Sequence, residues 1–452
     1  MKRLLLSGLI LFISLASAWT PPERVDRKPD NYVTYDNDIA VDRNGTPHIV
    51  WSECKRETYY EKVMYARRDG DTWTIPVNVS RDSGDFLVVA IAIDTFGVPI
   101  VVWSKEYEAR IRYSRLVGDT WSVPKLVFPI YAFTPRLVVD HHNRIHLLCE
   151  SPGTSEGVIW YSYYISDADS WAEPCTVAFC PSRGLGWSNI TVDRYDRLHA
   201  VWMDYQTYGL GYSYKDSSGW SEPMRLPDPS GSHQSCYPAV ACDSLGRPHV
   251  VWEERSGGYW IYYSMFDGDS WSTPFLLYEE GGGRPQIVCD RYNRLHVVWA
   301  CDYGLRHKIK ADTGWIGPIV VTERSGLLAL TAGTEALHLA TRLSGFCLYY
   351  LSHNLSEGVE ENGLLNNIDN SPRLMVPGMT KNGLEVGYII SKETEVLLEV
   401  FDVQGRCVWQ RRVGKQKSGW YKLRVPAPCA GLYFVRLIAG PVILTRRCVK
   451  VK

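Results

Sequence analysis

The feature that most constrains the fold of this 452-residue chain is a ten-residue phrase that recurs along it. The phrase reads DRYDRLHAVW at 193–202 and DRYNRLHVVW at 290–299, with Asp first, His seventh and Trp tenth. Six copies begin at Asp42, Asp94, Asp140, Asp193, Asp243 and Asp290. The spacings between them are 52, 46, 53, 50 and 47 residues, and a seventh, eroded copy has Ala332 in the Asp position. A period of this length indicates a repeat architecture.

A second element follows each of the six copies, in which a Trp precedes a Pro by three residues. The pairs are Trp73/Pro76, Trp121/Pro124, Trp171/Pro174, Trp220/Pro223, Trp271/Pro274 and Trp315/Pro318. Each unit contains four short β-type runs separated by turn residues, as in AVACD, RPHVVWEE, WIYYSMF and WSTPFLL of the fifth unit. Four antiparallel strands per unit predict an all-β chain in which each unit is one blade of a β-propeller.

The seventh unit lacks its Trp-x-x-Pro run, and the missing run stands near the start of the chain. WTPPERV (Trp19, Pro22) matches WTIPVNV (Trp73, Pro76). We therefore expect residues 19–25 to be the outermost strand of the last blade, which leaves no unpaired sheet edge where the chain ends meet. The sequence predicts seven blades over residues 19–354.

The repeated residues have an architectural and a functional interpretation. The Trp of the phrase is expected to pack between neighbouring blades. The histidines in register could form a ligand ring, but bonds to a turn within each blade are favoured, because symmetry serves packing better than catalysis. These histidines are His48, His146, His199, His249, His296 and His338.

The N-terminal segment MKRLLLSGLILFISLASA has the cationic start, apolar run and small-residue end of a secretory signal over residues 1–18. No other apolar stretch reaches membrane length, so we expect an exported, soluble mature chain. Among the 12 cysteines, Cys175–Cys180 and some pair of Cys407, Cys429 and Cys448 are the expected bridges. No clustered Cys/His spacing indicates a metal, and no cofactor is expected.

Antiparallel alternation places the short first and third turns on one face and the variable loops on the other, where a ligand is expected. A recurring acid follows the second strand, with tyrosine next to it in three blades, and this pattern suits neutral-glycan binding. The competing interpretation is a solvated rim. The candidate residues, with one arginine near the start of a first strand, are Glu53, Glu106, Tyr107, Asp204, Tyr205, Glu254, Tyr259, Trp260, Asp302, Tyr303 and Arg284.

The second element resembles a worn Asp-box, Ser-x-Asp-x-Gly-x-Thr-Trp, of the sialidase-like (BNR-repeat) propellers. Ser114, Gly118, Thr120 and Trp121 match the pattern, whereas Leu116 stands where the boxed Asp is expected. The resemblance covers about 330 residues and implies the fold. A sialidase of this kind needs three arginines, a Tyr–Glu pair and an acid Asp, and no residue here sits in a matching motif, so no catalytic residue is assigned.

A Gly/Asn-rich linker, residues 355–372, precedes a basic segment, residues 373–452, with 15 Lys+Arg against 5 Asp+Glu. VFDVQGR, GWYKLRV, AGLYFVRL and the Lys-rich end CVKVK are similar to the C-terminal sorting domain of the type IX secretion system. The resemblance implies a small immunoglobulin-like sandwich, contact with that secretion machinery, and release or attachment at the surface of a Gram-negative-type bacterium. An ordinary accessory sandwich is the alternative.

These features favour an exported, monomeric propeller that binds a carbohydrate or a protein, without nucleic acid as a partner. The alternatives are a sialidase-like exo-glycoside hydrolase and a structural or adhesive surface protein. An enzyme is the less favoured interpretation because no catalytic motif survives. Three arginines converging at the channel mouth beside an acid–tyrosine pair would favour the hydrolase.

Overall fold

The computed structural model describes residues 19–355 and 373–450. Short gaps fall at 29–30, 58–60, 82–86, 106–109, 153–155, 230–233, 256, 312–313, 344–345, 376–378, 381–383, 391–392, 418, 426–430 and 441. The chain divides into two compact units, Met1–Gly358 and Val359–Lys452. The described elements are strands apart from one 3₁₀ turn, Ser166–Ala168, which confirms the prediction of an all-β chain with four-stranded antiparallel sheets.

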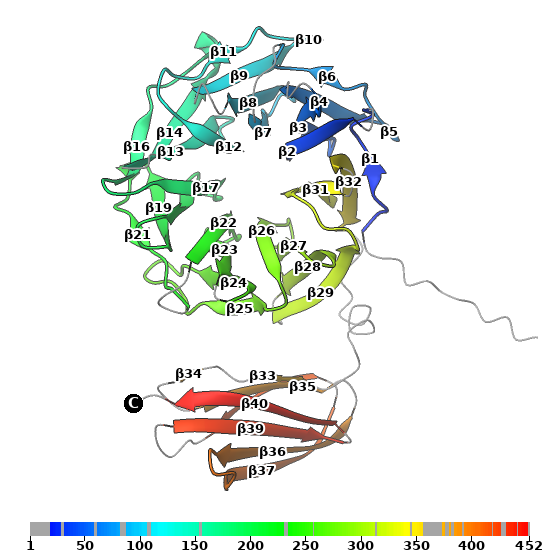
Figure 1. The fold of residues 1–452 in the computed structure, drawn as a ribbon, viewed down its shortest axis with the longest axis vertical. Coiled ribbons are helices and arrows are strands. Elements are labelled where there is room, and N and C mark those ends of the chain that lie inside the picture. The colour runs from blue at the N-terminus through cyan, green and yellow to red at the C-terminus, as the bar shows by residue number, and fades with distance from the viewer. Residues whose placement is uncertain are drawn as a thin grey trace, which may run out of the picture. The chain divides into compact units, whose positions relative to one another are not determined.

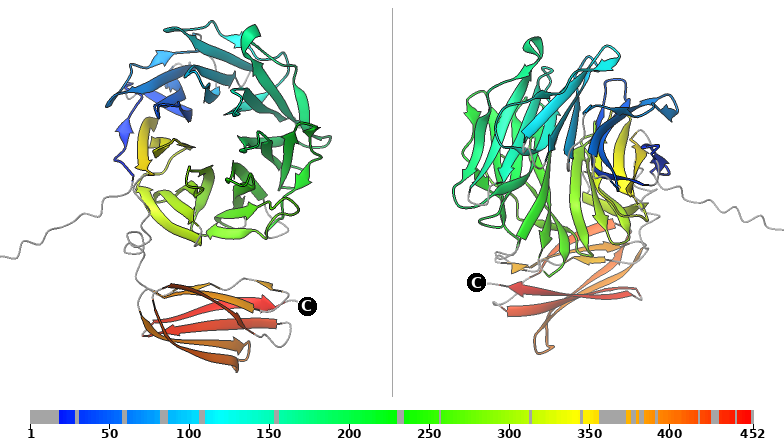
Figure 2. Two further views of the ribbon diagram at one scale, coloured as in Figure 1. Left: turned by 180° about the vertical axis from the view of Figure 1, so that it is seen from behind. Right: turned by 45° about the horizontal axis from the view of Figure 1, so that its top comes forward.

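The first unit contains seven antiparallel sheets among its described residues, arranged radially around an open centre (Figure 1; Figure 2, left). Each sheet is named here by the strand that lies nearest the centre. The β2 sheet has β2 (Tyr32–Val41), β3 (Pro47–Lys55), β4 (Glu61–Asp69), β5 (Thr72–Trp73) and β6 (Val77–Asn78). The β7 sheet has β7 (Leu87–Ile93), β8 (Pro99–Lys105), β9 (Arg110–Val117), β10 (Thr120–Trp121) and β11 (Lys125–Leu126). The β12 sheet has β12 (Phe133–Val139), β13 (Ile145–Pro152), β14 (Gly157–Ile165), β15 (Ser170–Trp171) and β16 (Cys175–Cys180).

The remaining sheets of the first unit follow the same order. The β17 sheet has β17 (Leu185–Val192), β18 (Leu198–Asp204), β19 (Gly209–Asp216), β20 (Gly219–Trp220) and β21 (Met224–Arg225). The β22 sheet has β22 (Gln234–Cys242), β23 (Pro248–Arg255), β24 (Tyr259–Met265) and β25 (Phe275–Tyr278). The β26 sheet has β26 (Gly282–Cys289), β27 (Leu295–Cys301), β28 (Gly304–Ala311) and β29 (Gly314–Thr322). The β30 sheet has β30 (Leu328–Ala332), β31 (Ala336–Leu343), β32 (Cys347–Asn354) and β1 (Glu23–Arg24).

The hydrophobic core lies between neighbouring sheets, and the repeated Trp of the phrase lies within it. Trp51, for example, belongs to one buried cluster with Ala340 and Leu348 of the adjacent β30 sheet. Trp299 packs in the same way with Val251 of the β22 sheet. The repeated tryptophans are at most 3% exposed, so the phrase is architecture, as predicted from its symmetry. Burial of such a side chain contributes on the order of 4–6 kcal/mol gross, as an upper value.

The repeated histidines are bonded within their own sheets, which confirms the structural interpretation. His146 shows the pattern: its Nε2 lies 3.0 Å from Oδ2 of Asp140, and its Nδ1 lies 2.8 Å from the hydroxyl of Tyr161. The tyrosine comes from the third strand and has equivalents that the sequence did not reveal. The other imidazole–hydroxyl pairs are His48–Tyr65, His199–Tyr212, His249–Tyr263 and His338–Tyr350.

The start of the described chain lies beside its seventh sheet. Glu23 pairs with Tyr350, and Arg24 pairs with Tyr349, in antiparallel register. The backbone N–H of Val25 donates to the carbonyl of Leu348 at 2.9 Å. The Trp19 side chain, 3% exposed, belongs to the buried cluster formed by the β26 and β30 sheets. Segments more than 300 residues apart in sequence therefore share one sheet.

The second unit contains two sheets among its described residues. The smaller has β33 (Arg373–Met375), β35 (Leu384–Ile390) and β38 (Gly419–Val425). The larger has β34 (Met379–Thr380), β40 (Val442–Lys450), β39 (Gly431–Ala439), β36 (Thr394–Asp402) and β37 (Cys407–Gln416). Val386 and Val425 of the smaller sheet pack with Leu398 and Val435 of the larger in one buried cluster, so this unit has a core of its own.

The expected Cys175–Cys180 bridge is wrong. Both residues stand on β16, and both are free thiols. Five residues of extended strand span roughly 16 Å, well beyond the Cα separation of about 6 Å that a disulfide needs. Cys407 is also free, while Cys429 lies outside the described residues. No described helix is long and apolar enough to span a membrane.

Candidate functional site

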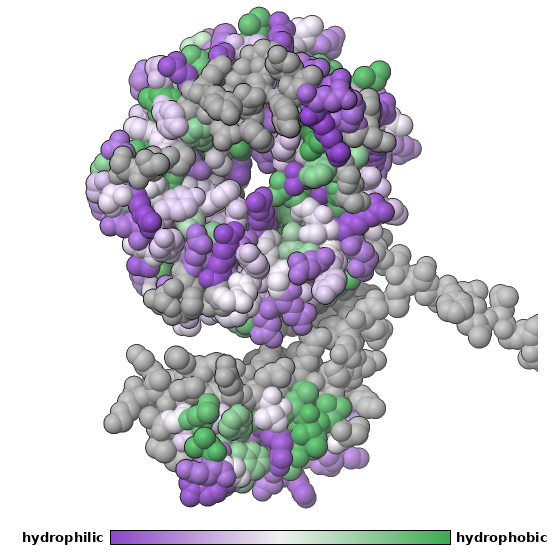
Figure 3. All heavy atoms as spheres, in the orientation of Figure 1, coloured by the Kyte–Doolittle hydropathy of each residue, from purple (hydrophilic) through white to green (hydrophobic). Residues whose placement is uncertain are grey.

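A channel of about 520 Å³ runs along the centre of the first unit, where Figure 3 shows the opening. A second cavity of about 340 Å³, called here the mouth cavity, lies at the starts of the innermost strands. This end of the channel is the face of the variable loops, where the sequence placed the ligand. The lining residues are Tyr35, Asp36, Asn37, Val88, Thr134, Arg136, Trp187, Ser188, Asn189, Tyr237, Pro238, Arg284, Gln286, Leu327 and Leu328.

A β-bulge at the start of the innermost strand shapes the mouth cavity. In the β17 sheet the register jumps between Gly186 and Asn189, so that Trp187 and Ser188 oppose a single residue of β18. The same jump occurs near the starts of β2, β12, β22 and β26. Bulges bend a strand and re-aim its side chains, and they recur beside functional sites.

Four of these bulges carry a non-glycine residue in the left-handed region of backbone space. The residues and φ angles are Thr134 at 49°, Trp187 at 52°, Tyr237 at 50° and Arg284 at 49°. This conformation is disfavoured for residues with a β-carbon, above all for the β-branched Thr134. Strain of this kind, repeated at equivalent positions, indicates that the surrounding structure imposes it.

Two aromatic side chains and an arginine form one wall of the mouth cavity. The ring centroids of Trp187 and Tyr237 are 4.1 Å apart, with their planes inclined at 52°. The guanidinium carbon of Arg284 lies 4.7 Å from the Tyr237 ring centroid, and its Nη2 donates to the Tyr237 hydroxyl at 3.2 Å. Trp187 keeps 36% of its surface exposed. An exposed aromatic face beside fixed donors is an arrangement suited to binding a polar ligand with an apolar side.

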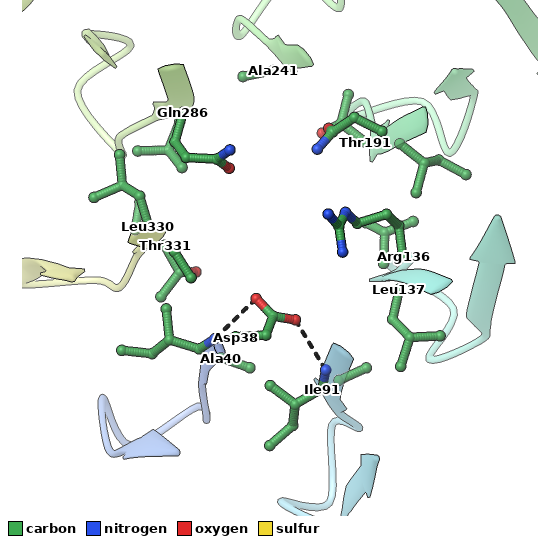
Figure 4. A pocket seen from close by; sticks show the side chains of 18 of the residues that line it. Asp38, Ala40, Ile91, Arg136, Leu137, Thr191, Ala241, Gln286, Leu330 and Thr331 are labelled. Atoms are coloured by element: carbon green, nitrogen blue, oxygen red, sulfur yellow. Dashed lines mark hydrogen bonds between the residues drawn. The ribbon is translucent and has the colours of Figure 1, made fainter. Parts of the chain in front are cut away.

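Two carboxylates of β2 and one guanidinium of β12 face the channel. Figure 4 shows Asp38 and Arg136 directed into it from different sheets, with Thr191 and Gln286 beside them. Oδ2 of Asp38 accepts the backbone N–H of Ile91 at 3.0 Å, and Oδ1 accepts that of Ile39 at 2.9 Å. Burial raises the pKa of Asp38 to about 6, against the opposing effect of these hydrogen bonds and of Arg136.

Asp36 lines both the channel and the mouth cavity, and Arg136 lines both of them as well. Burial raises the pKa of Asp36, while the charges of Arg136 and Arg284 act in the opposite direction. Burial lowers the pKa of Arg342; the charge of Arg284 lowers it further, and Asp36 and Tyr35 raise it. Arg136 and Arg284 line the mouth cavity, whereas Arg342 lines neither cavity and donates to the backbone carbonyl of Thr34 at 3.2 Å.

Buried carboxylates of neighbouring sheets hold two of the bulges. Oε2 of Glu150, on β13, accepts the backbone N–H of Ser188 at 3.0 Å, and burial raises the pKa of this carboxyl. Oε2 of Glu253, on β23, accepts the backbone N–H of Arg284 at 3.0 Å. Oε1 of Glu253 accepts the Nε–H of Arg255 at 2.7 Å. Each bulge is therefore fixed from the preceding sheet.

The acids predicted after the second strands lie at this end of the unit but behind the innermost strand. Glu53 is 6% exposed and accepts the indole N–H of Trp51 at 3.0 Å. Glu254 is fully buried and accepts the hydroxyl of Ser235 at 2.6 Å. Asp204 accepts the backbone N–H of Gln206 at 2.8 Å within its own turn. In these three sheets the repeated acid supports the fold and does not reach the cavity.

The other predicted site residues divide among the cavity, its support and the rim. Arg284 lines the mouth cavity. Tyr205 is half-buried behind it, and burial raises its pKa to about 12 while a hydrogen bond to Trp187 acts in the opposite direction. Tyr259, Asp302 and Tyr303 are exposed, Trp260 is half-buried, and none of them lines either cavity. Glu106 and Tyr107 lie outside the described residues.

Five of the cavity residues that sequence reasoning missed share one register position with Arg284, which it predicted. The residue six places before the repeated Asp differs from copy to copy, and every one of the six lines the mouth cavity. They are Asp36, Val88, Thr134, Trp187, Tyr237 and Arg284. A position that varies within an otherwise regular repeat was the available signal, because the repeated Asp and Trp mark the positions at which nearly every copy meets the same packing demand, and this position is not one of them.

The fold and the mouth cavity define the class of protein: a β-propeller-like unit with a polar and aromatic cavity at one end of its channel. No protein-family model matches the chain, and no curated protein matches its sequence. Among solved structures it is similar to the polysaccharide lyase Uly1, with a TM-score of 0.55 and 10% identity over 70% of this chain and 89% of that one.

Two further structures extend the comparison. A fungal alcohol oxidase of the AA5 family in complex with copper has a TM-score of 0.50 and 12% identity, over 96% of this chain and 100% of that one. The alpha-L-arabinanase of Penicillium chrysogenum complexed with arabinobiose has a TM-score of 0.42 and 14% identity, over 60% of this chain and 94% of that one. At these identities the likenesses to the lyase and the oxidase show the fold alone, and the likeness to the arabinanase is weaker.

Proposed function

We propose that the first unit is a seven-bladed propeller that binds a carbohydrate in the mouth cavity. Each of the seven sheets is then one blade, and residues 19–25 complete the last blade. The proposal rests mainly on the bulges, which present different side chains at one register position around the cavity. Trp187 and Tyr237 would stack on a sugar ring, while Arg136 and Arg284 would bond its oxygens.

The two arginines favour a sugar with a carboxylate or sulfate group. Residues 1–372, which include the linker, carry 34 Lys+Arg against 45 Asp+Glu, and this average charge argues against an anionic ligand. The mouth cavity differs from that average, since Arg136 and Arg284 line it and Asp36 is the one acid among its lining residues. A guanidinium fork matches carboxylate and sulfate oxygens well, and local charge governs a site of this size. The polysaccharide lyase of similar fold is compatible with this proposal.

A glycan array that includes neutral, uronic-acid and sulfated glycans tests the proposal. Titration calorimetry with the best ligand would then compare the chain from Trp19 onward with Trp187→Ala and Arg284→Gln. We expect each substitution to weaken binding at least tenfold, or about 1.4 kcal/mol. Tyr303→Ala is the matched control, because its side chain is 73% exposed on the rim and should leave affinity unchanged. An array without any hit, or a loss only in the control, would reject the mouth cavity as a sugar site.

Glycoside hydrolysis is a second candidate, because Asp36, whose pKa burial raises, shares the mouth cavity with Arg136 and Arg284 and would suit the role of a general acid. A panel of fluorogenic glycosides, including sialosides and uronides, separates it from binding alone. Turnover that Asp36→Asn abolishes would establish the hydrolase. Binding without turnover would leave the chain as a lectin, and neither activity would favour a structural or adhesive surface protein.

We also propose that residues 1–18 are removed during export and that the second unit is an immunoglobulin-like type IX sorting domain. The second unit has two sheets that enclose a separate hydrophobic core, and this is compatible with such a sandwich, as is its net positive charge. In a host with this secretion system, a chain lacking residues 373–452 should accumulate in the periplasm. Normal export of that truncated chain would refute the assignment.

A further inference from the structure

The turns between the first and second strands, opposite the mouth cavity, are linked from sheet to sheet by one repeated hydrogen bond. The backbone N–H of Thr95 donates to the side-chain oxygen of Asn143 at 2.5 Å. The backbone N–H of Ser244 donates to the side-chain oxygen of Asn293 at 2.6 Å. Both acceptors are asparagines in the left-handed conformation, with φ of 66° and 63°. An amide side chain is therefore sufficient for the link.

The link between the β12 and β17 sheets departs from this pattern in both of its turns. The acceptor is Asp196, with φ of 60°, and its Oδ1 accepts the backbone N–H of His141 at 2.9 Å. The facing turn carries two consecutive histidines. Nδ1 of His141 lies 2.8 Å from Oδ1 of Asp196, and Nδ1 of His142 lies 2.9 Å from Oδ2. The link between the turns needs only a side-chain oxygen, so it does not explain why Asp196 is a carboxylate or why the facing turn carries two histidines.

A second carboxylate completes the cluster. Single ligand atoms of Asp140, His142 and Asp196 all lie within 4.8 Å of one another. Oδ1 of Asp140 accepts the backbone N–H groups of His142 and Arg144 at 2.9 and 2.7 Å, which fixes its position. The Asp140 side chain is 8% exposed, whereas that of His142 is 78% exposed. The cluster thus has a rigid, buried base and an imidazole that solvent reaches.

We propose that Asp140, His142 and Asp196 form a binding site for a divalent transition-metal ion between the two turns. Imidazole and carboxylate ligands suit first-row metals such as Zn²⁺, whose bonds to N and O are about 2.0–2.2 Å long. Since Asp140 is held in place, rotations of the His142 and Asp196 side chains would bring the ligand atoms onto one ion. His141, on the other oxygen of Asp196, is placed to join as a further ligand. The ion would fasten the β12 sheet to the β17 sheet.

The expectation of no metal came from the absence of clustered Cys/His spacing in the sequence. The ligands belong to two copies of the repeat whose Asp residues, Asp140 and Asp193, are 53 positions apart. The side-by-side packing of the neighbouring β12 and β17 sheets brings the turns together. The site lies on the face away from the mouth cavity and is independent of the carbohydrate proposal.

Calorimetric titration of ZnCl₂ into the tag-free, chelator-stripped chain, with its thiols alkylated, tests the proposal. We expect one ion per chain with micromolar or tighter affinity, and no comparable binding of Mg²⁺. Asp196→Asn is the decisive variant, because Asn143 and Asn293 show that asparagine keeps the link between turns. It should weaken Zn²⁺ binding at least tenfold and abolish the rise in melting temperature that Zn²⁺ gives the wild type.

Asp269→Asn makes the same change of charge on an exposed turn of the β22 sheet and should bind Zn²⁺ like the wild type. His142→Gln provides a second test that does not depend on the folding of the Asp196 variant, and it should also lose at least tenfold in affinity. Wild-type chain that binds no Zn²⁺ stoichiometrically would overturn the proposal. Equal binding by the wild type and by both site variants would overturn it as well.

Discussion

The indole N–H of Trp19 donates a hydrogen bond to Nδ1 of His307 at 3.2 Å, across 288 residues of sequence. An indole only donates, so His307 must be neutral and carry its proton on Nε2. That nitrogen lies 3.0 Å from Nδ1 of His296, whose own Nε2 lies 3.0 Å from Oδ2 of Asp290. His307 stands where other sheets have the tyrosine hydroxyl. A directed chain of hydrogen bonds thus joins the first described residue to the β26 sheet.

Replacement of Trp19 tests this connection. Trp19→Ala should lower the free energy of unfolding by about 3–5 kcal/mol, since a buried indole is removed. Trp19→Phe keeps most of the apolar contact but leaves Nδ1 of His307 buried without its donor, at a cost of about 1–3 kcal/mol. Urea denaturation followed by fluorescence measures both. Ile75→Ala, at a side chain 77% exposed on the outer edge, should change stability by less than about 0.5 kcal/mol. Equal stability of all four chains would show that the connection is not needed.

His338 gives a pH dependence whose sign follows from burial. Burial alone lowers its pKa to about 4, and Ala332 stands where other copies supply the Asp partner. Because the folded-state pKa lies below the unfolded value of about 6.5, the unfolded chain binds the extra proton first as the pH falls. The histidine's contribution is therefore complete above pH 6.5 and declines toward pH 4.

Comparison with His338→Gln isolates that effect from other titrating groups, including Asp38, whose raised pKa acts in the opposite direction. At pH 8 the wild type should be the more stable chain, since Nδ1 of His338 lies 2.7 Å from the Tyr350 hydroxyl. Between pH 6.5 and 4.5 the difference should change by about 2–3 kcal/mol in favour of the variant. Urea midpoints across this range measure it, and a constant difference would contradict the assigned burial.

We expect Trp187 to add little to the stability of the fold, because its backbone is strained, and to be needed for ligand binding in the mouth cavity. Its left-handed backbone, at φ 52°, is one that glycine adopts freely, whereas its ring is only partly buried. Trp187→Gly is thus expected to alter the free energy of unfolding by less than about 1 kcal/mol, because relief of strain offsets lost packing. Trp202→Ala, at a buried repeat tryptophan, should cost about 3–5 kcal/mol. If Trp187→Gly proves as destabilising as Trp202→Ala, the ring is part of the core.

Sequence reasoning succeeded where one physical demand is repeated in every copy. The Asp turn, the buried tryptophan and the histidine bonded within its sheet are such demands, so their period predicts the four-stranded sheets. It failed where copies differ. Bulges such as that of Trp187 leave no composition signal, because glycine, the usual left-handed residue, is absent from them. Glu53 and Glu254 were predicted to contact a ligand and lie buried behind the innermost strand, since their spacing predicts an edge of the sheet but not the side of the strand on which a carboxylate lies.

Glu253 offers a test of how the cavity wall is held. Its two oxygens accept the backbone N–H of Arg284 at 3.0 Å and the Nε–H of Arg255 at 2.7 Å, and it is 3% exposed. In Glu253→Gln one of these oxygens becomes an NH₂ group that faces an N–H donor of Arg284 or Arg255, and one hydrogen bond is lost. We therefore expect the free energy of unfolding to fall by about 1–3 kcal/mol. The Arg284 bulge should loosen with it, and affinity for the glycan ligand should fall several-fold. Glu222→Gln, an exposed site, is the control for both measurements. Reduced stability with unchanged affinity would mean that Glu253 supports the sheet without positioning Arg284.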